Sequence, residues 1–357
     1  MLSVTEEDSR KMTPQPLVSI SIPCRNEEKF IIKCLDSIIA NDYPKEILEV
    51  LVIDGMSEDG TKEIVNTYAR RHPFIKVINN PKKITSTALN TAIDYAKGNI
   101  IVWMSAHNLY ERDYISRCVD CLYKYGADNV GGIIKTIPRE DTFIGRAIVA
   151  SISHRFGVGN SHFRIKTDEP TRVDTVFGGC YKKDVFDRIG LFNENLERGQ
   201  DMEFNLRLKK AGGKILLVPD IVSYYYARSD LKSFWKHNWT NGVWTIQHFL
   251  YSTIMPVSWR HLVPLLFVTS LIGSAGVAFI ERPFLWLFLA ILGLYGVASL
   301  ASSFQIASEK RDIRYLVAMP FIFGMLHFGY GLGSLWGVFK LLGARKFWSK
   351  LLRVVVS

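Results

Sequence analysis

Residues 17–54 read LVSISIPCRNEEKFIIKCLDSIIANDYPKEILEVLVID and decide the fold class. The run LVSISIP (17–23) is short, rich in β-branched residues and closed by a proline, which is typical of a buried parallel strand. In the segment 26–40, apolar residues recur at helical spacing: Phe30, Ile31, Cys34, Leu35, Ile38 and Ile39. The run LEVLVID (48–54) predicts a second strand. The stretch therefore predicts a strand, a helix and a strand in succession.

The same alternation continues along the chain. Helical periodicity predicts helices over 57–71 and 84–98, and apolar runs predict strands over 74–80 and 99–106. This succession predicts an α/β fold with a doubly wound, mostly parallel sheet and right-handed crossovers. Ligands of such sheets bind at the carboxyl ends of the strands. We therefore expect a site among the residues at these ends, which are Pro23–Asn26, Asp54–Gly55 and Ser105–His107.

After Asp230 the composition changes. Residues 231–259 mix Trp, Phe and Tyr with Lys, His and Asn, a profile typical of interfacial helices on a membrane surface. Three apolar stretches follow, and each is near the ~20 residues that a helical span requires; they lie at about 262–280, 284–304 and 315–339. A soluble core helix explains one such stretch, but not three that are almost free of charge. The predicted organisation is a polar tail (1–16), an α/β domain (17–230), amphipathic interfacial helices (231–260), a transmembrane region (261–340) and a basic tail (341–357).

The distribution of charge supports a membrane rather than a nucleic acid as partner. The 357-residue chain has a formal net charge of +10. Residues 230–357 hold 12 Lys and Arg against 4 Asp and Glu, whereas residues 1–229 hold 32 against 30. Basic residues that flank apolar runs mark the cytoplasmic edges of a membrane protein. We therefore expect a lipid bilayer and no nucleic acid.

The expected orientation contains a conflict. Residues 1–16 lack the apolar core of a signal peptide, so we expect a cytosolic N-terminus and the α/β domain on the cytoplasmic side of a multi-pass cell-membrane protein. Three spans would then place the C-terminus outside. Its tail nevertheless favours the cytosol through Lys340, Arg345, Lys346, Lys350 and Arg353. Pro320 and several glycines leave open a broken or re-entrant third stretch, although we predict three spans.

Two aspartates occupy positions where carboxylates do chemistry. Asp54 ends the second strand, where it can accept hydrogen bonds from a nucleobase or a ribose. Asp201 begins a short predicted helix, where a carboxylate can act as a general base toward a hydroxyl. Taken alone, each is better explained as a turn or helix-cap residue.

Other candidates are weaker. His107 can bind a divalent ion, although Mg²⁺ prefers oxygen ligands and a hydrogen-bonded loop histidine is the simpler explanation. Gly178-Gly179 permits close backbone approach. Trp239 and Trp244 can stack against sugars or belong to a membrane-interface belt.

In their order, these pieces resemble the family 2 glycosyltransferases with the GT-A fold. The opening motifs are Val-Ser-Ile-Ser-Ile-Pro (18–23), Asn26-Glu27-Glu28 and Val-Ile-Asp-Gly-Met-Ser-Glu-Asp-Gly-Thr (52–61). Within the family the chain resembles the succinoglycan-biosynthesis glucosyltransferase-like branch, including its membrane-bound C-terminus. The motifs that carry this resemblance are Ser-Ala-His (105–107), Phe-Gly-Val-Gly-Asn-Ser-His-Phe-Arg (156–164), Val-Asp-Thr-Val-Phe-Gly-Gly (173–179), Phe-Asn-Glu (192–194) and Gln-Asp-Met-Glu-Phe-Asn-Leu-Arg-Leu (200–208). The resemblance covers about residues 17–340.

The resemblance implies transfer of one sugar from a nucleotide sugar, with a UDP-sugar favoured and a GDP-sugar possible. Asp201 matches the catalytic base of an inverting reaction, and a divalent cation (Mg²⁺ or Mn²⁺) would neutralise the leaving diphosphate. The residues expected to bind the nucleotide sugar are Pro23, Arg25, Glu27, Asp54, Lys83, Asn90, Ser105 and His107. Those expected on the acceptor side are Gly178, Gly179, Trp239 and Trp244.

The chain departs from the branch at two motifs. The branch reads Asp-Ala-His where this chain has Ser105-Ala106-His107, so one metal-ligand carboxylate is missing and His107 is the remaining candidate ligand. The branch reads Glu-Asp where this chain has Gln200-Asp201. The change removes a like charge that would raise the pKa of Asp201.

We therefore expect a membrane-bound glycosyltransferase that acts on a polyprenyl-linked glycan acceptor in polysaccharide or glycan biosynthesis. The loss of two acidic side chains leaves open a catalytically degenerate scaffold. A processive polysaccharide synthase is a further alternative, but the chain has no Gln-x-x-Arg-Trp sequence. A transporter is disfavoured because the apolar stretches carry almost no charge.

Overall fold

The computed structural model describes residues 15–159, 161, 168–252, 254, 259–345 and 347–349. Most of the predicted polar tail, part of the 156–164 motif and the end of the basic tail lie outside the described residues. The chain forms two compact units. The first comprises Met1–Ile133, Asp168–Glu194 and Arg207–Ser223, and the second comprises Ile134–Thr167, Asn195–Leu206 and Tyr224–Ser357.

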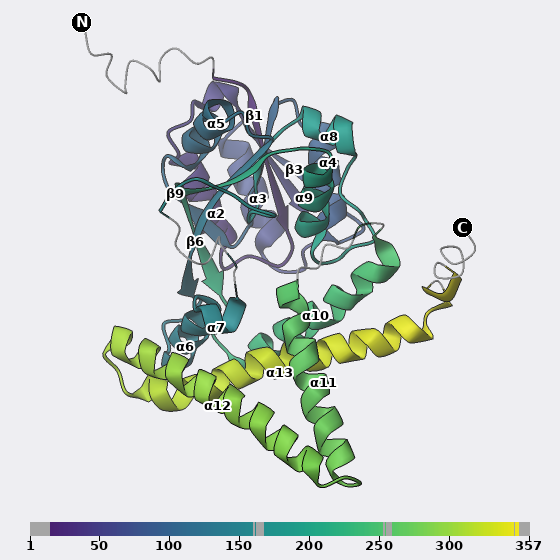
Figure 1. Ribbon diagram of the computed structural model, residues 1–357. Coiled ribbons are helices and arrows are strands. Elements are labelled where there is room, and N and C mark those ends of the chain that lie inside the picture. Colours follow the sequence, from purple (N-terminus) through teal and green to yellow (C-terminus); the bar gives the residue numbers. More distant parts are fainter. Residues whose placement is uncertain are drawn as a thin grey trace, which may run out of the picture. The chain divides into compact units, whose positions relative to one another are not determined.

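The first unit is built on parallel strands at the positions that the sequence predicts (Figure 1). These strands are β1 (Val18–Cys24), β2 (Leu48–Asp54), β3 (Ile75–Asn79) and β4 (Ile100–Trp103). Strand β1 pairs in parallel with β2 and β4, and β2 pairs in parallel with β3. The crossover helices are α2 (Ile31–Ile39), α3 (Thr61–Arg71) and α4 (Thr85–Tyr95). The predicted α/β alternation is confirmed.

Antiparallel strands extend this sheet beyond β4. Strand β8 (Cys180–Lys182) pairs antiparallel with β4 and with β6 (Asn129–Pro138). The strand order is β3-β2-β1-β4-β8-β6-β9-β5, with β7 paired to β9, so the sheet is mixed. The remaining elements of this part are η1 (Lys45–Ile47), β5 (Asn108–Tyr110), α5 (Tyr114–Lys124), β7 (Thr171–Arg172) and α8 (Asp184–Ile189). Helix α9 (Gln200–Lys210) and strand β9 (Ile215–Ala227) each have residues in both units.

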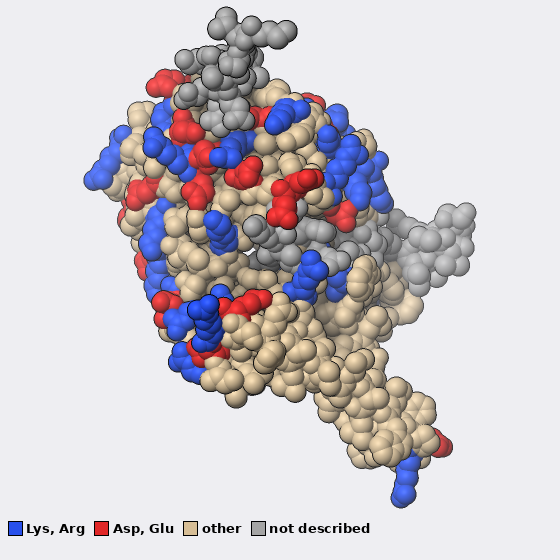
Figure 2. All heavy atoms as spheres, turned by 60° about the vertical axis from the view of Figure 1, so that its left-hand side comes forward, with Lys and Arg blue, Asp and Glu red and all other residues tan. Residues whose placement is uncertain are grey.

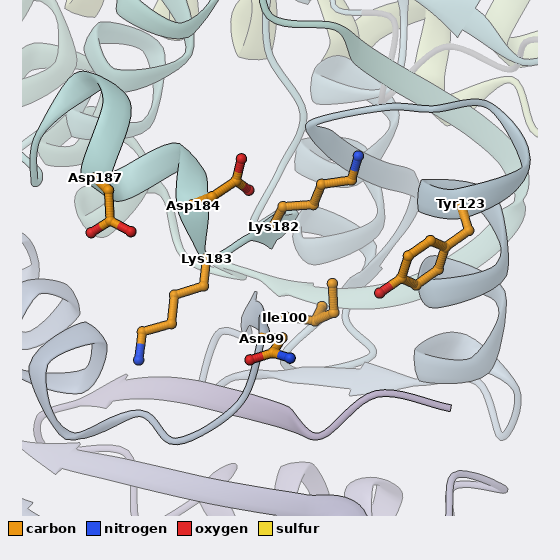
Figure 3. Close-up of a pocket in the computed structure, with 7 residues that line it drawn as sticks. All are labelled: Asn99, Ile100, Tyr123, Lys182, Lys183, Asp184 and Asp187. Atoms are coloured by element: carbon orange, nitrogen blue, oxygen red, sulfur yellow. The ribbon is translucent and has the colours of Figure 1, made fainter. Parts of the chain in front are cut away.

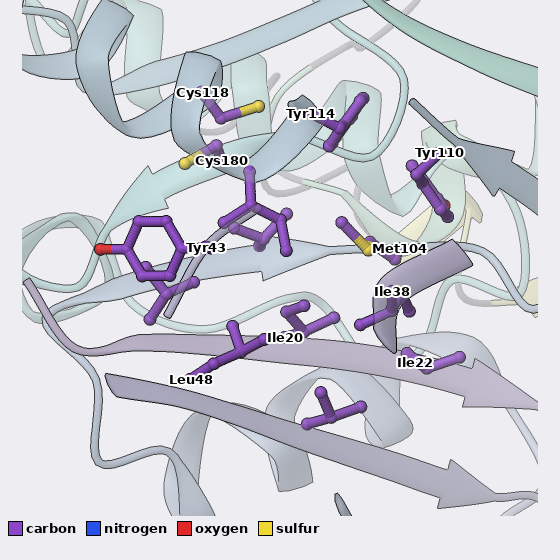
Figure 4. Close-up of a cluster of buried hydrophobic side chains, with 14 of the residues drawn as sticks. Ile20, Ile22, Ile38, Tyr43, Leu48, Met104, Tyr110, Tyr114, Cys118 and Cys180 are labelled. Atoms are coloured by element: carbon purple, nitrogen blue, oxygen red, sulfur yellow. The ribbon is translucent and has the colours of Figure 1, made fainter. Parts of the chain in front are cut away.

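An apolar core of buried side chains from β1, β2, β4 and the helices α2 and α5 stabilises this unit (Figure 4). Ile20 and Ile22 of β1 are fully buried, as are Val50 and Val52 of β2. In a parallel sheet that is covered on both faces, side chains on both sides of a strand are buried. This burial explains why the sequences of these strands are almost continuously apolar. In the paired register, Cys24 lies opposite Asp54, and Asp54 lies opposite Asn79. This register brings the polar ends of three strands to one edge.

The second unit contains the long apolar helices. They are α11 (Trp259–Ala278), α12 (Pro283–Lys310) and α13 (Arg314–Gly343), and each is long and apolar enough to cross a membrane. Helices α11 and α12 form a hairpin, and residues 261–280 and 283–308 of it include no Lys, Arg, Asp or Glu; Figure 2 shows this region as a tan surface with Lys or Arg and Asp or Glu side chains at its tip (Figures 1 and 2). The shorter helices are α6 (Phe143–Ile152), α7 (Arg155–Val158) and α10 (Leu231–Tyr251). The three apolar helices indicate a membrane protein.

Helix α13 is continuous through Pro320, so the alternative of a broken third stretch is wrong. Three of its glycines, Gly329, Gly333 and Gly337, pack against α10. A Cβ atom on Gly333 would lie 2.2 Å from the carbonyl oxygen of Trp239, and one on Gly242 would lie 2.1 Å from that of Tyr330. Small residues at the contact let two helix backbones approach closely. Helix α10 therefore packs directly along a helix that can span a membrane.

Candidate functional site

Polar side chains lie together at the carboxyl ends of β1 and β2 in the first unit, which we call the donor edge because the nucleotide-sugar donor is predicted to bind there. Asp54 is 1% exposed, and its Oδ1 accepts a hydrogen bond from Ser57 Oγ at 2.5 Å. The Ser57 backbone N–H lies 3.2–3.3 Å from the same carboxylate. A carboxylate has about four lone-pair sites. Asp54 is thus fixed in one orientation and keeps acceptor capacity for ribose hydroxyls.

The two loops at this edge are joined by reciprocal hydrogen bonds. The Asn26 N–H donates to Ser57 Oγ at 3.0 Å, and the Glu58 N–H donates to Asn26 Oδ1 at 2.9 Å. The Glu27 N–H donates to Thr61 Oγ1 at 2.8 Å. The backbone is left-handed at Asn26, Met56 and Lys83, with φ of 54°, 57° and 62°. Such backbone costs free energy in residues other than glycine and tends to persist at ligand sites.

Two cations at this edge share one carboxylate. Glu58 Oε1 lies 3.6 Å from Arg25 Nη2 and 3.7 Å from Lys83 Nζ. All three side chains are substantially exposed. Arg25 and Lys83 thus carry one positive charge more than the Glu58 carboxylate that they share, and these two cations can approach the phosphates of a nucleotide, although Asp54 and Glu27 add carboxylates to the same edge.

His107, the candidate metal ligand of the Ser105–His107 motif, contacts Glu27 in the loop that follows β1. His107 Nδ1 lies 3.0 Å from Glu27 Oε1, and Ser105 Oγ lies 3.4 Å from the imidazole. Glu27 thus brings a carboxylate to the place where Ser105 lacks one. Within the described part of the chain, no group of three His, Cys, Asp or Glu side chains could hold a metal ion. One carboxylate and one imidazole nevertheless fit a cation whose coordination substrate phosphates complete.

Four other residues that the sequence predicts at the donor or acceptor site lie in this unit. The side-chain amide of Asn90 donates to the Phe192 carbonyl and accepts from the Phe192 N–H, both at 2.9 Å. It anchors the segment that follows α8. Gly178 and Gly179 have φ of 69° and 109°. A Cβ atom on Gly178 would lie 2.6 Å from the Trp103 carbonyl oxygen, so this glycine permits close approach to the end of β4. Pro23 lies within β1, one residue before its end.

Asp201 belongs to the second unit and lies in the first turn of α9. Burial raises the pKa of Asp201, although backbone N–H groups of Met202 and Asp201 oppose the shift. The pKa is therefore raised even with glutamine at position 200. Gly199, with φ of 71°, precedes this turn, and a Cβ atom there would lie 2.6 Å from His248 Cε1. The ring of His248 thus shapes the segment that carries the aspartate.

The predicted acceptor tryptophans lie on α10 in the same unit. Both side chains are partly buried. The ring of Trp244 contacts that of Tyr251 at a centroid distance of 6.2 Å. The backbone of Trp239 lies against Gly333 of α13.

A further hollow lies elsewhere on the first unit (Figure 3). It has a volume of about 370 Å³ and is lined by residues that include Ile100, Lys182 and Asp184. Ile100 begins β4, so this hollow is at the opposite end of the strand from Trp103 and the predicted donor edge. Sequence reasoning did not predict it. It also missed Glu58, for which the only signal was its place in the acidic turn 54–61.

A mixed sheet whose buried aspartate and cations meet at the strand ends defines a nucleotide-binding α/β domain of GT-A type. The sequence profile described as "Glycosyl transferase family 2" matches residues 19–190. The chain is 34% identical over 233 residues to the Methanococcus voltae dolichyl N-acetyl-alpha-D-glucosaminyl phosphate 3-beta-D-2,3-diacetamido-2,3-dideoxy-beta-D-glucuronosyltransferase, across 63% of this chain and 71% of that protein. The chain belongs to glycosyl transferase family 2 and is a glycosyltransferase.

Two further likenesses extend over more of the chain. Identity to the succinoglycan biosynthesis protein ExoA of Rhizobium meliloti is 27% over 296 residues, across 82% of this chain and 86% of that protein. The structure resembles that of the Pyrobaculum calidifontis mannosyltransferase PcManGT in complex with GDP-Man and Mn²⁺, with a TM-score of 0.61 and 22% identity over 91% of this chain and 88% of that one. This structural likeness supports the GT-A fold.

Proposed function

We propose that this glycosyltransferase moves one sugar from a nucleotide sugar to a lipid-linked acceptor, with inversion at the anomeric carbon. A UDP-sugar is the favoured donor and a GDP-sugar the alternative. The observation that carries the proposal is the donor edge, where buried Asp54 accepts a hydrogen bond from Ser57, and Glu58 of the same loop lies 3.6 Å from Arg25 of the loop after β1. The M. voltae relative, whose name specifies a dolichyl-phosphate-linked sugar as acceptor, supports a lipid-linked acceptor.

In this mechanism Asp54 accepts hydrogen bonds from the ribose, beside Pro23. Arg25 and Lys83 approach the phosphates, and Asn90 holds the neighbouring segment in place. Glu27, His107 and Ser105 would hold a divalent cation, which when bound neutralises charge on the leaving diphosphate.

Asp201 acts as general base. It takes the proton of the acceptor hydroxyl as that oxygen attacks the anomeric carbon. One glycosidic C–O bond forms, the bond to the nucleoside diphosphate breaks, and no sugar–enzyme intermediate is required. The raised pKa of Asp201 makes the carboxylate a better proton acceptor than an exposed aspartate. Gly178, Gly179, Trp239 and Trp244 are proposed on the acceptor side.

The proposed location is the cell membrane, with the catalytic part on the cytoplasmic side. Nucleotide sugars are cytosolic, and the three apolar helices would hold the enzyme beside its lipid-linked acceptor. Lys310, Arg311 and Arg314, between the second and third spans, agree with this orientation, whereas the basic tail after the third span would lie outside the cytosol.

The test is a product analysis with purified protein in detergent. A polyprenyl-linked acceptor should gain the mass of one sugar, and NMR should show inverted anomeric configuration. Asp201→Asn should reduce transfer at least about 100-fold while the nucleotide Kd stays within twofold. Asp94→Asn, which alters an exposed aspartate of α4, is the matched control. Full transfer by Asp201→Asn would remove the base from the mechanism, and a ladder of long products would indicate a processive synthase.

A further inference from the structure

Arg198, in the segment that carries Asp201, belongs to a cluster of cationic and hydrogen-bond-donating side chains. Arg198 precedes Asp201 by three residues, and its Nη1 donates to Asn241 Oδ1 at 2.8 Å and lies 3.4 Å from His237 Nδ1. Both partners are on α10, one turn apart. Arg228 follows the end of β9. All four residues belong to the second unit.

The positive charge of this cluster is not offset by nearby carboxylates. Among the residues that the structure describes, no Asp or Glu lies within the 4.0 Å ion-pair distance of Arg198 or Arg228. Burial, and then the charge of Arg228, lower the pKa of Arg198, while Tyr225 and the exposed Glu197 act in the opposite direction. A partly buried charge costs free energy unless a counter-charge and hydrogen bonds compensate for it.

Two hydrogen-bond donors of the cluster face the same imidazole ring. Arg198 Nη1 faces one ring nitrogen of His237, and Asn241 Nδ2 lies 3.2 Å from the other. A neutral imidazole has only one acceptor nitrogen, so the ring can satisfy only one of these two donors. Rotation of the Asn241 amide does not resolve the mismatch, because its oxygen already accepts from Arg198. An oxyanion would accept hydrogen bonds from these donors and would place a negative charge beside the guanidinium groups.

We propose that Arg198, Arg228 and His237, with Asn241, form an oxyanion site for a phosphoryl group of the lipid-linked acceptor. The identity of the lipid rests on the proposed function, whereas the oxyanion site rests on the cluster itself. The guanidinium groups bind phosphate oxygens through charge-assisted hydrogen bonds, and Asn241 orients Arg198.

The position of the site favours the acceptor over the donor. Arg198 precedes the proposed base Asp201 by three residues, so the cluster belongs to the segment of the base and not to the donor residues of the first unit. His237 and Asn241 lie on α10, and the next residue, Gly242, packs against the Tyr330 carbonyl of α13. A phosphoryl group bound here would sit beside a helix that can span the membrane, where the phosphate of a polyprenyl carrier would lie.

A direct binding measurement tests the inference and does not require the enzyme to transfer a sugar. The full-length protein in detergent is titrated calorimetrically with a short-chain polyprenyl phosphate, the uncharged polyprenol of equal length, UDP, GDP and inorganic phosphate. Wild type should prefer the polyprenyl phosphate to the polyprenol at least tenfold. Arg198→Gln should abolish that preference and leave UDP and GDP binding within twofold. Arg71→Gln, on the exposed end of α3, is the matched control, and Arg228→Gln is the second variant if Arg198→Gln does not fold.

Each result decides the inference. Unchanged polyprenyl phosphate binding by a folded Arg198→Gln or Arg228→Gln variant would overturn the site. Loss of nucleotide binding instead would assign the cluster to the donor diphosphate and overturn the acceptor assignment. Inorganic phosphate binding as tightly as the polyprenyl phosphate would indicate an anion site without lipid specificity, which also contradicts the proposal. Failure of the proposed function appears separately, as absence of sugar transfer by wild type.

Discussion

Replacing Glu58 with glutamine should strengthen nucleotide binding. The Glu58 carboxylate lies 3.6 Å from Arg25 Nη2 and 3.7 Å from Lys83 Nζ. Two unit charges at such a distance attract each other by about 1 kcal/mol in water, and exposure reduces each pair to roughly 0.2–1 kcal/mol. A nucleoside diphosphate competes with Glu58 for these two cations. The two pairs together amount to about 0.4–2 kcal/mol, so removing the carboxylate should raise nucleotide affinity about two- to thirtyfold at low salt.

The assay is calorimetric titration of UDP and GDP into wild type and Glu58→Gln. Glu63→Gln makes the same charge change at an exposed position of α3 and is the control. At about 1 M salt the screening length falls to about 3 Å, so the gain should disappear. The reasoning fails if Glu58→Gln binds no more tightly than Glu63→Gln, or if the gain survives high salt.

Three further predictions concern the base and two glycine contacts. Burial raises the pKa of Asp201, and the base must be deprotonated to act. The kcat should therefore be retained above that pKa and fall as the pH drops through it, at a higher pH than the ~3.9 of an ordinary aspartate. A kcat that stays constant down to about pH 4 would contradict this prediction. Gly179→Ala should lower the melting temperature more than Gly212→Ala, because both have positive φ but only Gly179 would place a Cβ atom 2.7 Å from its neighbours; we expect about 1–2 kcal/mol for Gly212→Ala and about 3 kcal/mol or more for Gly179→Ala. Gly333→Ala should destabilise the contact between α10 and α13, whereas Gly324→Ala, with no atom within 4 Å of its Cβ position, should be neutral or slightly stabilising in thermal melts; equal effects would argue against glycine-mediated packing.

The parallel half of the sheet could be predicted because its information is local. Strands such as 18–24 are buried on both faces and bounded by turn residues, and the helices between them repeat every three or four residues. The antiparallel strands escaped prediction. Strand β8 is only three residues long, and its pairing with β4 joins segments that lie far apart in the chain. No periodic pattern marks such short, non-local pairings.

The candidate site divides in the same way. The positions of Asp54 and Asp201 followed from strand and helix ends. The contact between Glu27 and His107 joins residues 80 positions apart, and the contact between Arg198 and Asn241 joins residues 43 apart. No local pattern in the sequence predicts either of these long-range contacts. The glycines of the third apolar stretch were visible, but they suggested a broken helix because their packing partner, α10, cannot be inferred from the stretch itself.

The most direct test of the central claim is nucleotide release by the purified protein. A panel of UDP- and GDP-sugars is supplied with a polyprenyl-linked acceptor, with and without Mg²⁺ or Mn²⁺. The account predicts acceptor-dependent release from one donor, stimulated by the cation and weakened by Glu27→Gln, because Glu27 and His107 lie together at the donor edge. Binding of nucleotide without release from any donor would contradict the account and favour a degenerate scaffold.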